Sequence, residues 1–135
     1  MTMGQMTIFD LARRGMSAQL VRMNAAASNL ANAGTVSGSE DGAYRPVRAV
    51  FAEDLDRATG LASVRVSAVT RENAPAIREH NPDHPLADAN GDVWTSPVDE
   101  NAEMVEMLES ARQYQNLVEA LSTAKQLMLE TMRMK

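Results

Sequence analysis

Two histidines have a spacing that suggests metal chemistry. His80 and His84 lie four residues apart, and on a helix this spacing places two metal ligands on one face. Pro82 and Pro85 forbid a regular helix over this segment, so the geometric reason for a metal site is lost. We therefore favour a solvated turn here, with a metal site as the alternative.

A second candidate for cation binding follows at 88–92, with the sequence Asp-Ala-Asn-Gly-Asp. The order of residues is similar to the start of a calcium-binding loop. Gly91 comes two places too early for such a loop, and Asp99 stands where the loop would end in Glu. We favour a turn here too, and we expect no cofactor and no metal.

Three carboxylates follow at three-residue steps, namely Glu103, Glu106 and Glu109. No histidine accompanies them and they flank an apolar pattern, so a solvated helix face is the favoured interpretation. The sequence contains no nucleophile elbow and no phosphate-binding loop. It also contains no Cys, which excludes disulfides and thiolate chemistry. These patterns predict a protein that is not an enzyme.

The composition limits the partners of the 135-residue chain. A net charge of −5 argues against nucleic acid and gives no reason to expect an anionic membrane surface. No apolar run approaches the roughly 20 residues that cross a bilayer, so no direct membrane insertion is expected. The first nine residues lack the basic and apolar regions of a cleavable secretory signal.

The N-terminal part, 1–33, is predicted to be a helix over 6–33. Large apolar side chains recur every seven residues, and smaller ones occupy intermediate positions of the same stripe. Gly34 then ends the helix. The recurring residues are Phe9, Met16, Met23 and Leu30.

The middle part, 34–98, is predicted to be a small β-rich module or a mostly extended segment. Turn-forming residues cluster at 34–42, and four prolines break up the later residues. Strands are predicted at 44–51 and at 63–69, where apolar and polar residues alternate.

The C-terminal part, 99–135, shows the most regular pattern. Asp99 or Ser96 can cap a helix over 99–133. Apolar residues then follow in alternating steps of three and four, the spacing of a coiled-coil seam that only Lys125 interrupts. The seam residues are Met104, Met107, Ala111, Tyr114, Val118, Leu121, Met128 and Met132.

These patterns predict a mainly α fold in which the long terminal helices pair as a coiled coil and form one helical domain. The first helix is basic and the second acidic, which favours their pairing. A single chain of this length cannot bury both apolar stripes completely. The remaining surface requires partners, which favours an assembly component.

The chain resembles the flagellar axial proteins in several segments. Gly15–Gln19 and Ala27–Ala33, followed by Thr35, are similar to the motif that opens the rod and hook proteins of the bacterial flagellum. Tyr44–Phe51 follows at a suitable distance. Asn81–Val93 and Glu103–Gln115 resemble one family in particular, the proximal-rod FlgC family. The resemblance covers nearly the whole chain.

The resemblance implies a structural subunit of the proximal rod in the basal body. Such subunits assemble helically through their terminal helices, and together they form a periplasm-spanning drive shaft around an export channel. They leave the cell through the flagellar export apparatus without a cleaved signal peptide. The implied partners are other copies, other rod subunits and that apparatus. A soluble helical adaptor or chaperone-like binding module is the alternative.

The assembly contacts are expected on the two apolar stripes named above. Asn29 and Asn32, at the end of the first helix, are expected to offer their amides for fixed contacts between subunits.

Overall fold

The computed structural model describes residues 6–134, and the first helix, α1, spans Ile8–Ala31. Thr7 caps its start: its hydroxyl accepts from the Asp10 backbone N–H at 3.2 Å, while the Asp10 carboxylate accepts from the Thr7 N–H at 3.0 Å. After the helix, Gly34 adopts a φ of 76°, a left-handed conformation that glycine adopts readily. The helix is close to the one predicted over 6–33.

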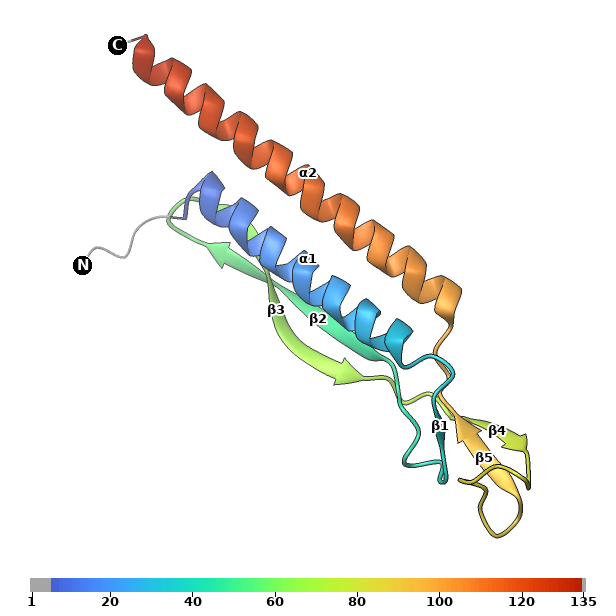
Figure 1. The fold of residues 1–135 in the computed structure, drawn as a ribbon. Helices are drawn as coiled ribbons and strands as arrows, with labels where there is room; N and C mark the ends of the chain where they lie inside the picture. Colours follow the sequence, from blue (N-terminus) through green and yellow to red (C-terminus); the bar gives the residue numbers. More distant parts are fainter. Residues whose placement is uncertain (1–5, 135) are drawn as a thin grey trace.

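The second helix, α2, spans Glu100–Arg133 and runs antiparallel to α1 (Figure 1). The Asp99 carboxylate caps it by accepting from the Asn101 and Ala102 N–H groups. Its 34 residues exceed the 24 of α1, so the last turns of α2 extend beyond the point where α1 begins. The start of α1 and the end of α2 therefore lie at the same end of the molecule.

A long hairpin forms a third layer below α1. Strands β2 (Val47–Asp56) and β3 (Leu61–Arg71) pair antiparallel, with a register shift between Val50 and Phe51. Gly60, at a φ of 72°, completes the turn between them. Figure 1 shows α1 between this hairpin and α2.

A second, smaller sheet lies at the far tip of the molecule. It has the strand order β1 (Val36–Ser37), β5 (Asp92–Thr95) and β4 (Ile77–His80), all antiparallel. The Val93 side chain is buried and forms the centre of this small module. β5 leads directly into α2, so the sheet fixes where the second helix begins.

The predicted fold class is wrong in two respects. The middle segment is neither a small module nor a mostly unpaired extended segment. Its strands β2 and β3 are ten and eleven residues long, and together they cover α1 along one face. The terminal helices pair, but they do not form a coiled coil with an apolar seam. Their contact uses small and charged residues, since α1 must pack against α2 on one side and the hairpin on the other.

The buried face of α1 consists mainly of small residues, which allow both layers to approach closely. The buried positions are Ala12, Gly15, Ala18, Ala25, Ala26 and Asn29.

Candidate assembly surface

The contact between the two helices is polar near its centre. Glu103 and Ser110 are the buried residues of α2, and the Ser110 hydroxyl donates within its own helix to the Glu106 carbonyl at 2.7 Å. The Arg22 guanidinium donates two hydrogen bonds to the Glu106 carboxylate, one of them from Nε at 3.0 Å. These hydrogen bonds lower the pKa of Glu106 and raise the pKa of Arg22. The charges on the two helices thus pair within one chain.

A buried carboxylate ties the start of α2 to the hairpin. The Glu103 side chain is 1% exposed, and the Arg48 guanidinium of β2 donates to both of its oxygens. Arg48 also donates to Glu72 at 2.7 Å, and these hydrogen bonds raise the pKa of the guanidinium. A bidentate pair is the geometry that offsets the desolvation of a buried charge. Glu103 is therefore not on a solvated face, contrary to the sequence interpretation.

Asn29 joins the end of α1 to the start of β2. It is fully buried, and its amide Nδ2 donates to the Val47 carbonyl at 2.9 Å. Its Oδ1 accepts from the Val47 N–H at 2.8 Å and from the Tyr44 hydroxyl at 2.8 Å. The side chain pairs with the Val47 backbone much as a neighbouring strand would. Asn32 is half-buried, and its amide donates to the Ser28 carbonyl at 2.8 Å.

The helix residues predicted for assembly fall into two groups. Those on α1 are half-buried, as are four of those on α2. The others on α2 are exposed to between 42% and 66%. The half-buried set is Phe9, Met16, Met23, Leu30, Met107, Ala111, Tyr114 and Leu121, and the exposed set is Met104, Val118, Met128 and Met132.

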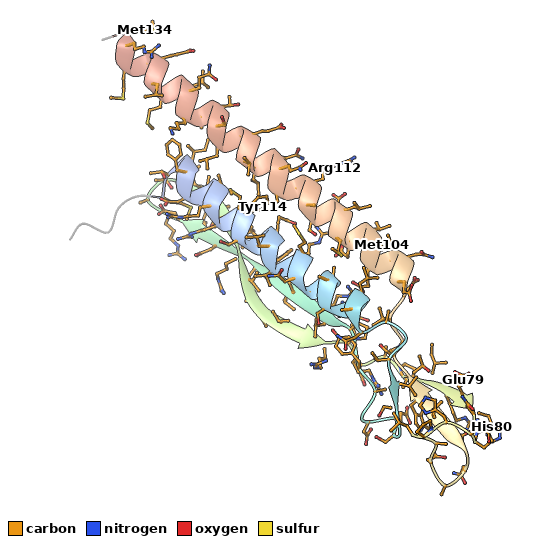
Figure 2. The ribbon with its side chains drawn as sticks, in the orientation of Figure 1. Glu79, His80, Met104, Arg112, Tyr114 and Met134 are labelled. Carbon is orange, nitrogen blue, oxygen red and sulfur yellow. The ribbon has the colours of Figure 1, made fainter. Side chains whose placement is uncertain are left out.

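Two of these exposed residues, Met104 and Val118, belong to an apolar flank that runs along α2, away from its contact with α1. Leu108, which was not among the predicted residues, completes the flank between them and is 69% exposed. Figure 2 labels Met104 near the start of α2 and Met134 at its far end. Because residues one apart on a helix differ by 100° in direction, the face that contacts α1 is offset by one residue from the predicted seam. The facing residues are Glu106, Ser110, Gln113 and Leu117, and Glu103, at the start of the same row, contacts the hairpin instead.

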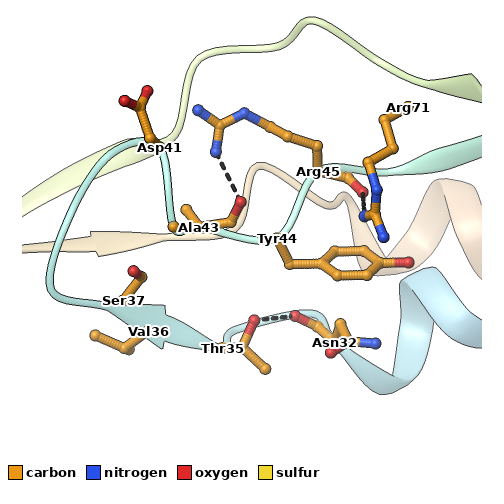
Figure 3. Close-up of a pocket in the computed structure, with 10 residues that line it drawn as sticks. Asn32, Thr35, Val36, Ser37, Asp41, Ala43, Tyr44, Arg45 and Arg71 are labelled. Atoms are coloured by element: carbon orange, nitrogen blue, oxygen red, sulfur yellow. Dashed lines mark hydrogen bonds between the residues drawn. The ribbon is translucent and has the colours of Figure 1, made fainter.

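A polar pocket of about 520 Å³ lies where α1 meets the small sheet (Figure 3). The Arg71 guanidinium lies 5.3 Å from the centre of the Tyr44 ring and donates to the Arg45 carbonyl at 3.2 Å. On the opposite wall the Thr35 hydroxyl donates to the Asn32 carbonyl at 2.7 Å. The first bond ties the loop before β2 to the end of β3, and the second closes the turn after α1. The Tyr44 hydroxyl, which donates to Asn29 Oδ1 at 2.8 Å, joins this loop to α1.

His80 ends strand β4 beside Asp92 of β5, whereas the other metal candidates form local turns. His80 Nδ1 lies 3.0 Å from an Asp92 carboxylate oxygen, whereas His84 Nδ1 accepts from the Leu86 N–H at 3.0 Å. The Asp88 carboxylate accepts from the N–H groups of Asn90 and Asp92, each at 2.9 Å, and so closes a turn. Within residues 6–134, no three His, Asp or Glu side chains are grouped in a way that could hold a metal ion.

Comparison with known proteins matches both ends of the chain and then its whole length. A family model described as "Flagella basal body rod protein" matches residues 9–37, and "Flagellar basal body rod FlgEFG protein C-terminal" matches residues 89–134. The flagellar basal-body rod protein FlgC of Salmonella typhimurium is 41% identical over 130 residues, covering 96% of this chain and 97% of the relative. The chain belongs to the FlgC family of flagellar basal-body rod proteins.

Other FlgC proteins agree with this assignment. The Escherichia coli O6:H1 protein is 40% identical and the Buchnera aphidicola protein from Acyrthosiphon pisum 32% identical, each covering 96% of this chain and 97% of the relative. The predicted family is confirmed. The FlgC-family chain is a structural rod subunit of the basal body and not an enzyme, and the helical adaptor is not favoured.

The two matched segments correspond to distinct parts of the fold. The first covers α1 and β1, and the second covers β5 and α2, while the β2–β3 hairpin lies between them. None of the helices that the structure describes is both long enough and apolar enough to cross a membrane.

Proposed function

We propose that this FlgC-family chain is a subunit of the proximal rod that joins other copies and other rod subunits through its terminal helices. Assembled helically, such subunits form the periplasm-spanning drive shaft and its export channel. The chain reaches this position through the flagellar export apparatus without a cleaved signal peptide. The observation that carries the proposal is the exposed apolar flank of α2.

The flank is unusual because its apolar side chains do not pack against α1, although α1 lies beside α2 in the same chain. α1 lies along α2, yet Met104, Leu108 and Val118 turn away from it and remain 52%, 69% and 42% exposed. Each side chain gains about 25 cal/mol for every Å² of apolar surface removed from water. A neighbouring subunit that covers the flank therefore supplies a driving force that the isolated chain lacks.

The polar contact inside the chain complements this arrangement. The Arg22–Glu106 pair joins α1 to α2, and the Arg48–Glu103 pair joins the hairpin to α2, so paired charges fix these elements within one subunit. The exposed apolar side chains of the flank are then left for contacts between subunits. Charged pairs set orientation, whereas apolar burial contributes most of the association energy.

The test replaces Leu108 with Glu in a strain whose only copy of the gene carries the variant. Because Leu108 is 69% exposed, the substitution should change the stability of the isolated chain by less than about 0.5 kcal/mol. Swimming in soft agar should be lost, and the variant should be absent from purified basal bodies.

Gln115→Glu is the matched control, since Gln115 lies seven residues further along the same exposed side of α2 and is already polar. This control should assemble and support swimming. A Leu108→Glu chain that assembles at the native level would contradict the role of the flank.

A further inference from the structure

The last turns of α2, residues 125–134, form an overhang that projects past the start of α1 (Figure 1). Every residue in it is exposed, and its apolar side chains are directed to more than one side of the helix. Leu127 and Leu129, for example, differ by about 200° in direction. The exposed apolar residues are Leu127, Met128, Leu129, Met132 and Met134, at 58%, 50%, 50%, 66% and 88%. Nothing in residues 6–134 covers them.

An apolar groove lies beside the first turns of α1, bounded by α1, the hairpin and the middle of α2. It has a volume of about 640 Å³. Because Gly15 and Ala12 lack large side chains, the surface of α1 is recessed where it lines the groove. Its apolar lining includes Ile8, Leu11, Phe51, Ala62, Leu117 and Ala120.

We propose that the overhang of one copy seats in this groove of a second copy of the same chain. The inference rests on the proposed rod function and specifies one of its contacts. Both surfaces are apolar, and both require cover that the single chain does not provide.

The charges at the edges of the two surfaces are complementary. Lys125 and Arg133 outnumber Glu130 in the overhang, which gives it a net charge of +1 over 125–134. Glu53 is the charged residue of the groove lining, and it makes no ion pair with any residue of 6–134. An overhang seated in the groove would bring its net positive charge to the Glu53 carboxylate. This complementarity favours a second copy of the chain over an acidic partner.

The positions of the two surfaces set the kind of assembly. Groove residue Leu117 and overhang residue Thr131 lie on one helix, about 14 residues or 21 Å apart. A parallel neighbour displaced by about this distance presents its groove at the level of the first copy's overhang. The contact joins different surfaces of identical chains, so it can repeat without closing, as an open helical array requires.

Disulfide crosslinking tests the contact directly, because the chain contains no Cys of its own. Met132→Cys is placed in one copy and Glu53→Cys in another, and both are expressed together in a strain that lacks the native gene. Basal bodies purified after mild oxidation should contain a crosslinked dimer of this chain. Neither variant expressed alone should give that dimer. The same mixture of purified full-length chains at high concentration provides a second measurement.

Arg78→Cys, in the small sheet at the opposite tip, replaces Met132→Cys as the matched control and should give no dimer with Glu53→Cys. The inference is overturned if both variants enter basal bodies but do not crosslink, if each variant crosslinks with itself, or if Met132→Cys links only to a different rod protein. Absence of both variants, and of the native chain, from basal bodies would instead contradict the proposed function.

Discussion

The Asn29 amide pairs with the backbone of Val47 as the backbone of a neighbouring strand would. A residue of this type at the end of a helix was expected to contact a neighbouring subunit. The structure instead places it fully buried, where it satisfies the backbone N–H and carbonyl of Val47 and the hydroxyl of Tyr44. Assembly contacts at Asn32 and along the stripes stay predictions. Because the sequence does not show which loop returns to this helix, it could not reveal that the partner of Asn29 is its own chain.

Replacing Asn29 with Ala should destabilise the chain strongly. The substitution leaves the part-buried N–H and carbonyl of Val47 without partners, and a buried polar group left unsatisfied costs about 1–3 kcal/mol. We expect a loss of about 2–4 kcal/mol in the free energy of unfolding, measured by urea denaturation. Asn32→Ala, which removes only a local bond to the Ser28 carbonyl, should cost less than about 1 kcal/mol. Equal losses for the two variants would contradict the assigned role of Asn29.

The bond between Arg22 and Glu106 predicts a loss of stability in acid. Because the pKa of the Glu106 carboxyl is lower in the folded chain than its ordinary value of 4.5, the unfolded chain takes up a proton first as the pH falls. The stabilisation is fully present above pH 4.5 and is lost as the pH falls through the folded pKa.

Thermal unfolding followed by circular dichroism between pH 7 and pH 3 checks this. The difference in Tm between the native chain and Glu106→Gln should be largest at neutral pH and should shrink below pH 4.5. Glu119→Gln, at an exposed position with no ion pair in residues 6–134, should show no such change. A constant difference for Glu106→Gln would refute the argument.

At the scale of elements, Gly15 sets how closely the two helices approach. A Cβ added there would lie 2.9 Å from Leu117 Cδ1, at the flexible end of a side chain. Gly15→Ala should therefore be nearly neutral, because a gain of about 1 kcal/mol in helix propensity offsets the crowding. Gly15→Val is larger and branched and should cost about 1–3 kcal/mol in the free energy of unfolding.

A double-mutant cycle with Leu117→Ala isolates this contact. Leu117→Ala removes the atoms that a Val at position 15 would meet, so the double variant should lose less than the sum of the two single losses. Chemical denaturation of the four chains measures the coupling. Strictly additive losses would mean that Gly15 does not control the helix separation.

The elements were easier to predict from sequence than the faces they bury. Gly34 and Asp99 are local signals, and they gave helix ends close to those observed. The face of α2 that was predicted to contact α1 is offset by one residue from the observed face, because the heptad pattern follows the apolar side chains. Glu103 is buried only because Arg48, 55 residues earlier in the chain, reaches it. Such a partner leaves no signal in the local periodicity of the helix.

The length of the two hairpin strands was underestimated for a related reason. The predicted strands ended where alternation stopped, yet β2 continues to Asp56 and β3 to Arg71. Many of these residues are exposed on one face, so their alternation of polar and apolar types is weak. What holds the strands is their pairing with each other and their packing on α1, which are contacts between distant parts of the chain.

At the scale of the whole molecule, folding and assembly use different parts of α2. The first two thirds of the helix lie along α1, whereas every residue of 125–134 is exposed and extends an existing helix. Helical residues without tertiary contacts contribute little to global stability. The overhang is therefore available for another chain without weakening the fold.

A chain that ends after Lys125 should therefore fold but fail to assemble. Its Tm should stay within a few degrees of the native value, because Leu121 and Ala124, the last half-buried residues of α2, are retained. A chain that ends after Ala120 loses both and should melt at a clearly lower temperature. Circular dichroism melts measure this pair, and immunoblots of purified basal bodies measure assembly. If the chain ending after Lys125 reaches basal bodies at the native level, the overhang is dispensable and the separation between folding and assembly surfaces is wrong.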